Sequence, residues 1–377
     1  MDRRSFLNAT LAAGVAGTAA VAHPTPQARP APAEPVPPSV WLVGDTAPLD
    51  PAAWSARLAR LAAREKVRDT YLAQGAVAEL ESAFAALLGK EDCAFFPTGT
   101  LANNVAVRVL CGEHPHALCQ HESHFYRDES DAAQRLAGLN LVPLAPGRAT
   151  PTLQEVATAF DEAEKGPFAL KVGALAIESP VRRQRGQLVP FPAIQALAEL
   201  AKAHGAGLHL DAARLLLAPP SLDLKAYAAP FDTVYVSLYK YLDAPFGAVL
   251  AGSKTHLAKA REFRHLYGGL LYQGWEAALV ALDSLKTFPA RMAQAHAVAG
   301  ALMSALEASG KVRHRVEPNA SNIHLLEMDA ALAQAAAERG RAAGVRLGPY
   351  ADGALTLGVN DTINRKTVGE YVKVFLG

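Results

Sequence analysis

Apolar residues recur along this chain with the spacings of helices and strands, and the two kinds of segment alternate from about residue 40. Between Ala76 and Leu88 the apolar positions fall on one helical face, and Gly89 can end that helix. Further helices are expected over 101–110, 152–164 and 190–204, and one long helix is expected over 273–308. Short apolar runs predict strands at 93–96, 139–144, 172–177, 207–210, 233–238 and 246–252, and two more at 322–327 and 354–358.

This alternation predicts the fold class. Strands that are apolar throughout and separated by helices are typical of a parallel sheet covered on both faces. We therefore expect an α/β fold with a mostly parallel sheet in a large domain over 40–285. A small C-terminal α/β domain is expected over 286–377. Ligands of such sheets bind at the carboxyl ends of the strands, so the chemistry is sought there.

The first 39 residues have the pattern of an export signal followed by a linker. Over 1–22, Arg3-Arg4 precedes Phe6-Leu7, and an uncharged stretch of about a dozen residues ends in Ala-Val-Ala. This predicts a twin-arginine export signal cleaved before His23, and hence a periplasmic protein with no membrane span in its mature form. An ordinary signal or an uncleaved anchor is the alternative, and an unused signal implies a cytoplasmic protein. Seven prolines within 24–38 indicate a linker over 23–39.

Composition narrows the function classes. The 37 basic and 36 acidic residues leave a formal net charge of +1, and the chain has no long basic run, so a nucleic-acid partner is not expected. Three cysteines exclude a disulfide-built scaffold. With half of its residues hydrophobic, the chain can bury a large core. An enzyme that acts on a small molecule is the expectation.

Two charged residues follow apolar strands. Asp211 ends the run Leu208-His209-Leu210, and Lys240 comes just after the strand at 233–238. A carboxylate at the end of a buried strand is costly unless it meets a cation, which Arg214 could supply within the same turn. A lysine that is partly desolvated there has a lowered pKa and can form a Schiff base, whereas a solvated one would have no such role.

A turn and a histidine complete the constellation. Thr98-Gly99-Thr100 joins a strand to a helix, where backbone N–H groups and hydroxyls can bind a phosphate. His124 comes after the apolar run Ala117-Leu118-Cys119, which reads as a buried strand, and it could cover an aromatic ring. A lysine for an aldehyde, a carboxylate for a ring nitrogen and a phosphate cup are what pyridoxal 5′-phosphate requires. Together these parts predict that cofactor.

The chain resembles the threonine aldolase branch of the beta-eliminating lyases, which are pyridoxal-phosphate enzymes of the aspartate-aminotransferase fold (fold type I). The resemblance covers almost the whole chain from about Asp45. The segments that carry it are Phe96 to Asn103, Ser123-His124 with Glu129, Ala176-Ile177-Glu178, His209 to Arg214, Ser237-Leu238-Tyr239-Lys240 with Ala244-Pro245, Gly268-Gly269 and Gln273-Gly274.

The resemblance implies a role for each matching residue. Lys240 holds the cofactor, and Asp211 keeps the ring nitrogen protonated. Gly99 and Thr100 bind the phosphate, and Thr98 and Ser237 also belong to the cofactor site. His124 stacks on the ring near the substrate hydroxyl. Arg214 lies near the substrate carboxylate and the cofactor oxygen. Family members assemble their sites between subunits, so a homo-oligomer, a dimer or a tetramer, is expected.

The segments that bind substrate depart from the family pattern. Thr356 occupies the position of the carboxylate-binding Arg in the small domain, and Tyr272 replaces another Arg. Ser179-Pro180-Val181 stands where the family has Asn-Thr-His. Three arginines follow, at 182, 183 and 185, and we expect one of them, Arg183, to bind the substrate carboxylate.

The expected activity is aldol cleavage of a threonine-like β-hydroxy-α-amino acid to glycine and an aldehyde. The substrate's amino group displaces Lys240 from the cofactor, and His124 takes the hydroxyl proton. The same cofactor would allow β-elimination, racemisation or decarboxylation, or binding without turnover. A different class remains open as well, because the six Cys and His residues within 111–124 could bind zinc or copper in an exported protein, although their spacing fits no standard site.

Overall fold

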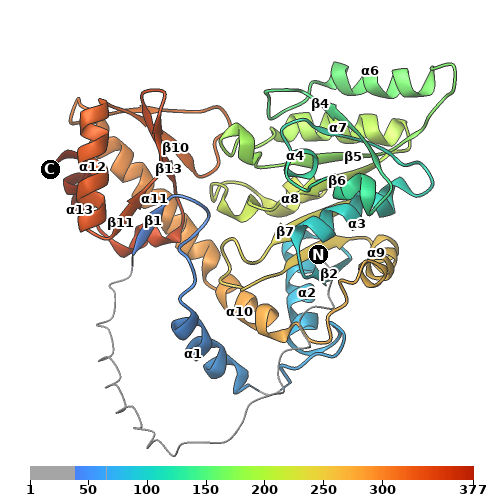
Figure 1. Ribbon diagram of the computed structural model, residues 1–377, viewed down its shortest axis with the longest axis horizontal. Coiled ribbons are helices and arrows are strands. Elements are labelled where there is room, and N and C mark those ends of the chain that lie inside the picture. The colour runs from blue at the N-terminus through green and yellow to red at the C-terminus, as the bar shows by residue number, and fades with distance from the viewer. Residues whose placement is uncertain (1–38, 65) are drawn as a thin grey trace, which may run out of the picture. The chain divides into compact units, whose positions relative to one another are not determined.

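The computed structural model describes residues 39–64 and 66–377, which belong to one compact unit (Figure 1). The predicted signal over 1–22 and the predicted linker, apart from Ser39, lie outside the described residues. Within the described part of the chain, no helix is both long enough and apolar enough to cross a membrane.

The large part of this unit is built on a seven-stranded sheet in the order β2-β8-β7-β6-β5-β3-β4. The strands are β2 (Asp92–Phe96), β3 (His116–Gln120), β4 (Asn140–Leu144), β5 (Val172–Glu178), β6 (Gly207–Asp211), β7 (Thr233–Ser237) and β8 (Ala248–Gly252). Strands β4, β3, β5, β6 and β7 run parallel, and β8 is antiparallel to both of its neighbours, β7 and β2. The predicted α/β class and mostly parallel sheet are confirmed.

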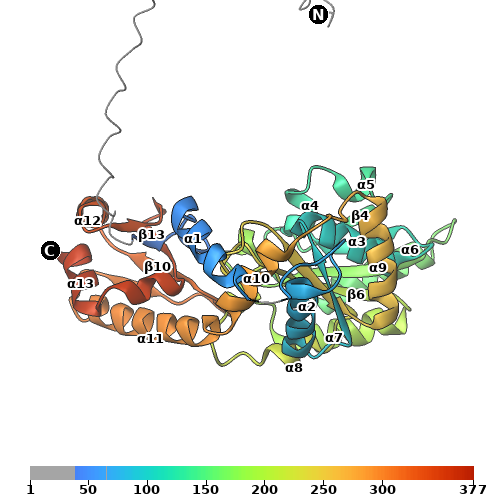
Figure 2. The ribbon, with the colours of Figure 1, turned by 90° about the horizontal axis from the view of Figure 1, so that it is seen from below.

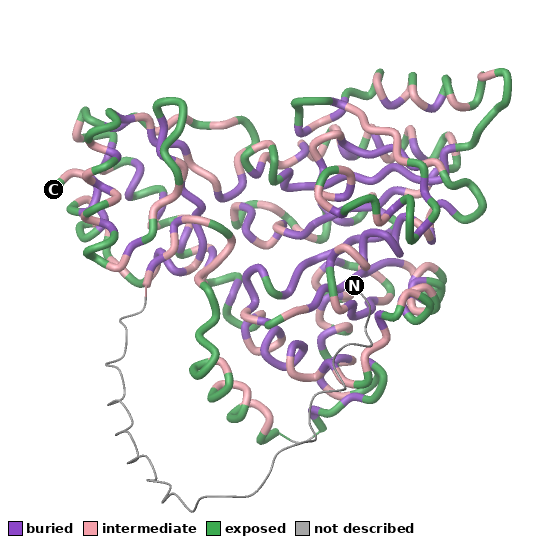
Figure 3. Tube along the Cα trace, viewed as in Figure 1, coloured by how far each residue is buried: buried purple, intermediate pink, exposed green. Residues whose placement is uncertain are grey.

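Helices cover both faces of this sheet, as alternating side chains of one strand show. Val234 and Val236 on β7 pack in the core formed with α2, α7 and α10, whereas Tyr235 packs in the core formed with α3 and α9. Figure 3 shows the strands as largely buried. The helices of this part are α1 (Pro51–Ala62), α2 (Gly75–Leu88), α3 (Gly99–Cys111), α4 (His124–Arg127), α5 (Ala132–Arg135), α6 (Leu153–Glu164), α7 (Phe191–Ala203), α8 (Leu224–Ala228), α9 (Lys254–Leu266) and α10 (Trp275–Leu285).

The C-terminal part has its own four-stranded antiparallel sheet, in the order β12-β13-β10-β9. Its elements are α11 (Phe288–Glu307), β9 (Arg313–Arg315), β10 (Ile323–Glu327), α12 (Ala330–Ala342), β11 (Val345–Leu347), β12 (Tyr350–Ala351), β13 (Ala354–Gly358) and α13 (Val368–Leu376). The first described strand, β1 (Val40–Leu42), pairs in parallel with β11. The first described strand therefore lies beside the C-terminal part, and the chain then continues into the large sheet.

The prediction of one long helix over 273–308 is wrong. The chain forms α10 and then α11, with a break at Lys286 and Thr287, and Figure 2 shows the two as separate helices. Pro289 stands in the first turn of α11. A proline inside a helix lacks the N–H for the i−4 carbonyl, here that of Leu285, and its ring collides with that carbonyl. A new helix start is the arrangement that accommodates it.

Candidate active site

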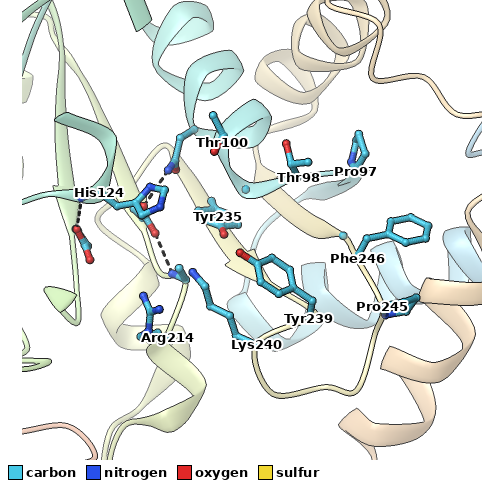
Figure 4. Close-up of a pocket in the computed structure, with 16 residues that line it drawn as sticks. Pro97, Thr98, Thr100, His124, Arg214, Tyr235, Tyr239, Lys240, Pro245 and Phe246 are labelled. Carbon is cyan, nitrogen blue, oxygen red and sulfur yellow. Dashed lines mark hydrogen bonds between the residues drawn. The ribbon is translucent and has the colours of Figure 1, made fainter. Parts of the chain in front are cut away.

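The carboxyl ends of β5, β6 and β7 meet at one edge of the large sheet, where Glu178 is in register with Asp211 and Asp211 with Tyr235. A cavity of about 360 Å³ opens there (Figure 4). Its lining includes most of the predicted site residues, namely Thr98, Gly99, Thr100, His124, Asp211, Arg214 and Lys240. Asn103, Glu178, Tyr235, Tyr239 and Phe246 also line it. Segments more than a hundred residues apart thus converge as the strand pattern predicts.

Lys240 lies in the turn that follows β7, and its side chain reaches into the cavity (Figure 4). Only 9% of Lys240 is exposed to solvent. Burial, together with the nearby charge of Arg214, lowers the pKa of its amine to about 8. Because the neutral amine is the nucleophile, this environment makes Lys240 reactive toward an aldehyde near neutral pH.

The turn between β2 and α3, Pro97 to Thr100, forms a cup at the edge of the cavity that is suited to bind an anion. Thr98 caps α3 by accepting a hydrogen bond from Leu101 N, so the helix begins at Gly99. The first N–H groups of a helix have no partner within it and attract negative charge. A Cβ at Gly99 would lie 2.0 Å from the hydroxyl of Tyr235, so only glycine fits this close approach.

Ser237 supplies a further polar group at the end of β7. It is fully buried, and among the described residues its Oγ has no hydrogen-bond partner. A buried hydroxyl without a partner costs free energy unless a bound group satisfies it. Ser237 is not among the lining residues of the cavity, although it precedes Lys240 by three positions.

Asp211 ends β6 as a buried carboxylate. Its Oδ1 accepts a hydrogen bond from the backbone N of Ala213 at 3.0 Å, and its Oδ2 accepts one from Asn103 Nδ2 at 2.8 Å. Both carboxylate oxygens are therefore fixed in place by donors. A carboxylate held in this way can pair with a protonated ring nitrogen.

His124 begins the short helix α4 and is held by two carboxylates. Its backbone N donates to Glu178 Oε2 at 2.6 Å, and its ring Nδ1 lies 3.1 Å from Glu129 Oε1. The hydrogen bond with Glu129 raises the pKa of His124 above its usual value. Burial, with the charge of Asp211 beside it, raises the pKa of Glu178 to about 7. Because Nδ1 is engaged by Glu129, Nε2 remains to exchange a proton in the cavity.

The two arginines predicted to bind substrate are both paired with carboxylates. Arg214 donates to both oxygens of Asp45, from Nε at 2.7 Å and from Nη2 at 2.9 Å. Arg183 pairs with Asp128 and does not line the cavity. The role predicted for Arg183 therefore stays a prediction, and it would require release from Asp128.

The six Cys and His residues of 111–124 do not converge. Across residues 39–64 and 66–377, no group of three or more His, Cys, Asp or Glu side chains is placed to hold a metal ion. Cys111 and Cys119 are buried, and burial raises the pKa of each thiol to about 12. The described geometry thus gives this segment no metal centre.

Several residues at the site received no role in the sequence analysis. Asp45, Glu129 and Glu178 appeared only as family matches, and Asn103 only as the end of a matching segment. The available signal was the pair Asn103-Asn104 in the predicted helix over 101–110, whose other residues are apolar except Arg108. A buried polar side chain needs partners, so these asparagines pointed to a buried polar network.

The chemistry of the set fits pyridoxal phosphate. Lys240 offers an amine to an aldehyde, Asp211 a carboxylate to a ring nitrogen, and the first turn of α3 at Gly99 offers N–H donors to a phosphate. His124 lies in the lining as the imidazole available to cover a ring.

Known proteins resemble the chain in sequence and in fold. A protein of Schizosaccharomyces pombe assigned as a low-specificity L-threonine aldolase is 32% identical over 216 residues, or 56% of each chain. The alanine racemase TOXG of Cochliobolus carbonum is 30% identical over 55% of this chain and 54% of its own. This chain thus spans little more than half of either relative. A candidate L-allo-threonine aldolase of Listeria monocytogenes has the same fold, with a TM-score of 0.75 and 24% identity over 90% of this chain and 95% of that one.

The beta-eliminating lyase family model matches residues 46–331, a range that runs from Thr46 through the whole large sheet and into α12. It includes the cup, His124, Asp211 and Lys240. This chain belongs to the beta-eliminating lyase family.

Proposed function

We propose that this protein is a pyridoxal-phosphate-dependent aldolase that cleaves a threonine-like β-hydroxy-α-amino acid to glycine and an aldehyde. The observation that carries the proposal is the convergence of a buried, low-pKa Lys240 with Asp211 and His124 in one cavity. The family is one of pyridoxal-phosphate enzymes, and one of the aligned relatives is assigned as a threonine aldolase.

When bound, the cofactor supplies an aldehyde that joins to amines and a ring that accepts electrons from a breaking bond. Lys240 would hold it, and the first turn of α3 at Gly99 would bind its phosphate. Asp211, whose oxygens accept hydrogen bonds from Ala213 N and Asn103 Nδ2, would pair with the protonated ring nitrogen. These residues would serve cleavage, elimination and racemisation alike.

His124 is the candidate base for aldol cleavage. Cleavage of the Cα–Cβ bond requires a base that takes the proton of the β-hydroxyl. His124 Nε2 is the atom that can do so, because Glu129 holds Nδ1 and orients the ring. In β-elimination the group at Cβ would instead have to leave, helped by an acid, and a protonated His124 could serve there, so the products decide between the two reactions.

The substrate carboxylate needs a cation, and the structure narrows the choice. Arg214 lines the cavity, but its guanidinium group already forms an ion pair with Asp45. Arg183 pairs with Asp128, and Arg185 with Glu317. Arg182 forms no ion pair within the described residues, and its backbone N is held by Glu178 Oε1 at 2.9 Å. Like Arg183, it is not among the residues that line the cavity, so its side chain would have to turn toward the cavity. We propose Arg182, together with Arg214, as the ligand of the substrate carboxylate.

The test is product analysis with purified protein, pyridoxal phosphate and each of L-threonine, phenylserine and L-serine. Glycine and the matching aldehyde should form, and Lys240→Ala should lower the rate by more than about 10³-fold. Pyruvate and ammonia from serine, without glycine from threonine, would establish β-elimination instead. Racemised amino acid without cleavage would place the chain with the racemase relative.

A further inference from the structure

A buried hydrogen-bond network lies behind the cavity and connects Asp211 to His124. Its centre is Asn103 on α3, which is 1% exposed. The two N–H bonds of its amide reach two different carboxylates, Asp211 Oδ2 at 2.8 Å and Glu129 Oε1 at 3.0 Å. Glu129 Oε1 in turn lies 3.1 Å from His124 Nδ1. A single amide therefore joins the carboxylate assigned to the cofactor ring to the one that holds the candidate base.

His209, on the side of Asn103 opposite the two carboxylates, fixes the orientation of the Asn103 amide. Asn103 Oδ1 lies 3.0 Å from His209 Nε2, and His209 Nδ1 lies 2.9 Å from Thr233 Oγ1. Burial lowers the pKa of His209 to about 4, so its ring is neutral and Nε2–H donates to the amide oxygen. A flipped amide would turn its oxygen toward both carboxylates, which repel it.

Two buried carboxylates placed this close are unstable as a pair of anions. Burial raises the pKa of Glu129, and the charge of Asp211 raises it further, while His124 and Asn103 oppose this by hydrogen bonding. Without a donor between them, one of the two carboxyl groups would take a proton. Either outcome is harmful. A protonated Asp211 could not form an ion pair with the ring nitrogen of the cofactor, and a protonated Glu129 would no longer offer a charged acceptor to His124.

We propose that Asn103 is a positioning residue that keeps Asp211 and Glu129 ionised together by donating one N–H to each. It touches neither substrate nor the reacting atoms in this account. The effect of Asn103 on Asp211 and the cofactor rests on the function proposed above. Its effect on Glu129 and His124 applies to the cofactor-free protein as well.

The first test is the pKa of His124 in the cofactor-free protein, followed by NMR of ¹³C-labelled histidine and assigned with His124→Gln. The charged groups around His124 are Glu129, Asp128, Asp211, Glu178 and Lys240. Asn103→Leu keeps the side-chain size and removes both donors. The pKa of His124 should fall by about one pH unit, since Glu129 then takes up a proton. An unchanged pKa in a folded variant would overturn the proposal.

The second test is the dissociation constant of pyridoxal phosphate, from absorbance titrations. Asn103→Leu should weaken binding by at least ~10-fold, and adding Glu129→Gln should recover much of the loss, because no second charge then opposes Asp211. Asn104→Leu is the matched control. Asn104 is also buried and donates to Glu129 Oε2 at 2.7 Å, but not to Asp211, so Glu129→Gln should bring no recovery in that background. Equal recovery in both backgrounds would contradict the proposal.

The outcomes separate this inference from the proposed function. A wild-type protein that binds no cofactor would refute the function and leave the His124 test standing. A wild-type protein that binds it, with Asn103→Leu unchanged in both measurements, would refute the role of Asn103 alone. If Asn103→Leu does not fold, Asn103→Ser applies, because one hydroxyl can donate to only one carboxylate and the same falls are expected.

Discussion

Lys240 owes its reactivity to its surroundings. An exposed lysine is almost fully protonated at neutral pH, whereas burial and the charge of Arg214 lower the pKa of Lys240 to about 8. The nearby carboxylates Asp211, Asp45 and Glu178 act in the opposite direction but do not cancel this effect. The neutral amine is thus a substantial fraction of Lys240 at pH 7 to 8.

This pKa predicts how cofactor uptake depends on pH. Because the neutral amine reacts, the uptake rate of the cofactor-free protein should rise with pH and level off above about 8. Stopped-flow absorbance between pH 6 and 10 measures it. Arg214→Met should move the plateau to higher pH, since it removes a charge that disfavours the ammonium. A rate that keeps rising toward pH 10.5 in the wild type would show an unperturbed lysine.

A second prediction at this scale concerns the substrate carboxylate. Arg182→Ala should raise KM by about 10-fold or more, the value of a charge-assisted hydrogen bond, with a smaller effect on kcat. Arg183→Ala is the matched control, because Asp128 already engages that guanidinium. Steady-state kinetics on the best substrate measures both. A larger KM effect for Arg183 would restore the sequence-based assignment.

The sequence predicts the residues that would contact the cofactor, but it does not predict the ion-pair partners that orient the arginines around them. Asp211 and Lys240 stand at strand ends, and strand ends can be read from apolar runs. The partners of Arg214 and Arg183 could not be read in this way, because Asp45 lies 169 residues from Arg214 and Asp128 55 residues from Arg183. Such pairs depend on tertiary packing.

Among the elements, α3 contributes to the site twice, because its first turn forms the cup and its next turn supplies Asn103 and Asn104, which hold the carboxylates behind the cavity. The close approach of Gly99 to Tyr235 is what lets the helix start beside the cavity. The cup is therefore sensitive to a single methyl group.

Two Gly→Ala changes in helices should have opposite results. In Gly99→Ala the new Cβ would meet the Tyr235 hydroxyl, so the cup must shift and cofactor affinity should fall by ~10-fold or more. In Gly300→Ala, within α11, the new Cβ meets nothing within 4 Å, and stability should rise by about 0.5–1 kcal/mol. Cofactor titration and urea denaturation measure these effects. An undamaged cup in Gly99→Ala would contradict the geometry described here.

The spacing of apolar residues predicts most strands of the large sheet and most of the helices that cover it. The elements that it missed have physical explanations. The break between α10 and α11 was missed because apolar residues continue through it, while Pro289 decides the outcome. Helix α1 was also missed, although Asp50 as cap and Pro51 at the first position are start signals. The pairing of β1 with β11 joins residues some 300 positions apart, which no local pattern reports.

At the scale of the whole molecule, the family and the fold are shown, while export and assembly remain proposals. The predicted twin-arginine signal lies outside the described residues. We propose that it carries the folded protein to the periplasm and that the mature protein is a dimer or tetramer. Both proposals rest on the sequence and on the family.

Export predicts a specific dependence on two arginines. Changing Arg3 and Arg4 together to Lys should retain the protein in the cytoplasm with residues 1–22 attached, because the signal receptor reads the pair. Cell fractionation and N-terminal sequencing measure this, and the wild type should begin at His23. Equal export of both proteins would leave an ordinary signal as the explanation, and no export of either would make the protein cytoplasmic.

The central claim is that Lys240 holds pyridoxal phosphate in the cavity at the carboxyl ends of the parallel strands. The most direct measurement is borohydride reduction of the cofactor-loaded protein, followed by peptide mass spectrometry, beside Lys240→Ala. If Lys240 holds the cofactor, an absorption band near ~420 nm and a cofactor-labelled peptide at Lys240 should appear, and both should be lost in the variant. A colourless protein, or a label on another lysine, would contradict it.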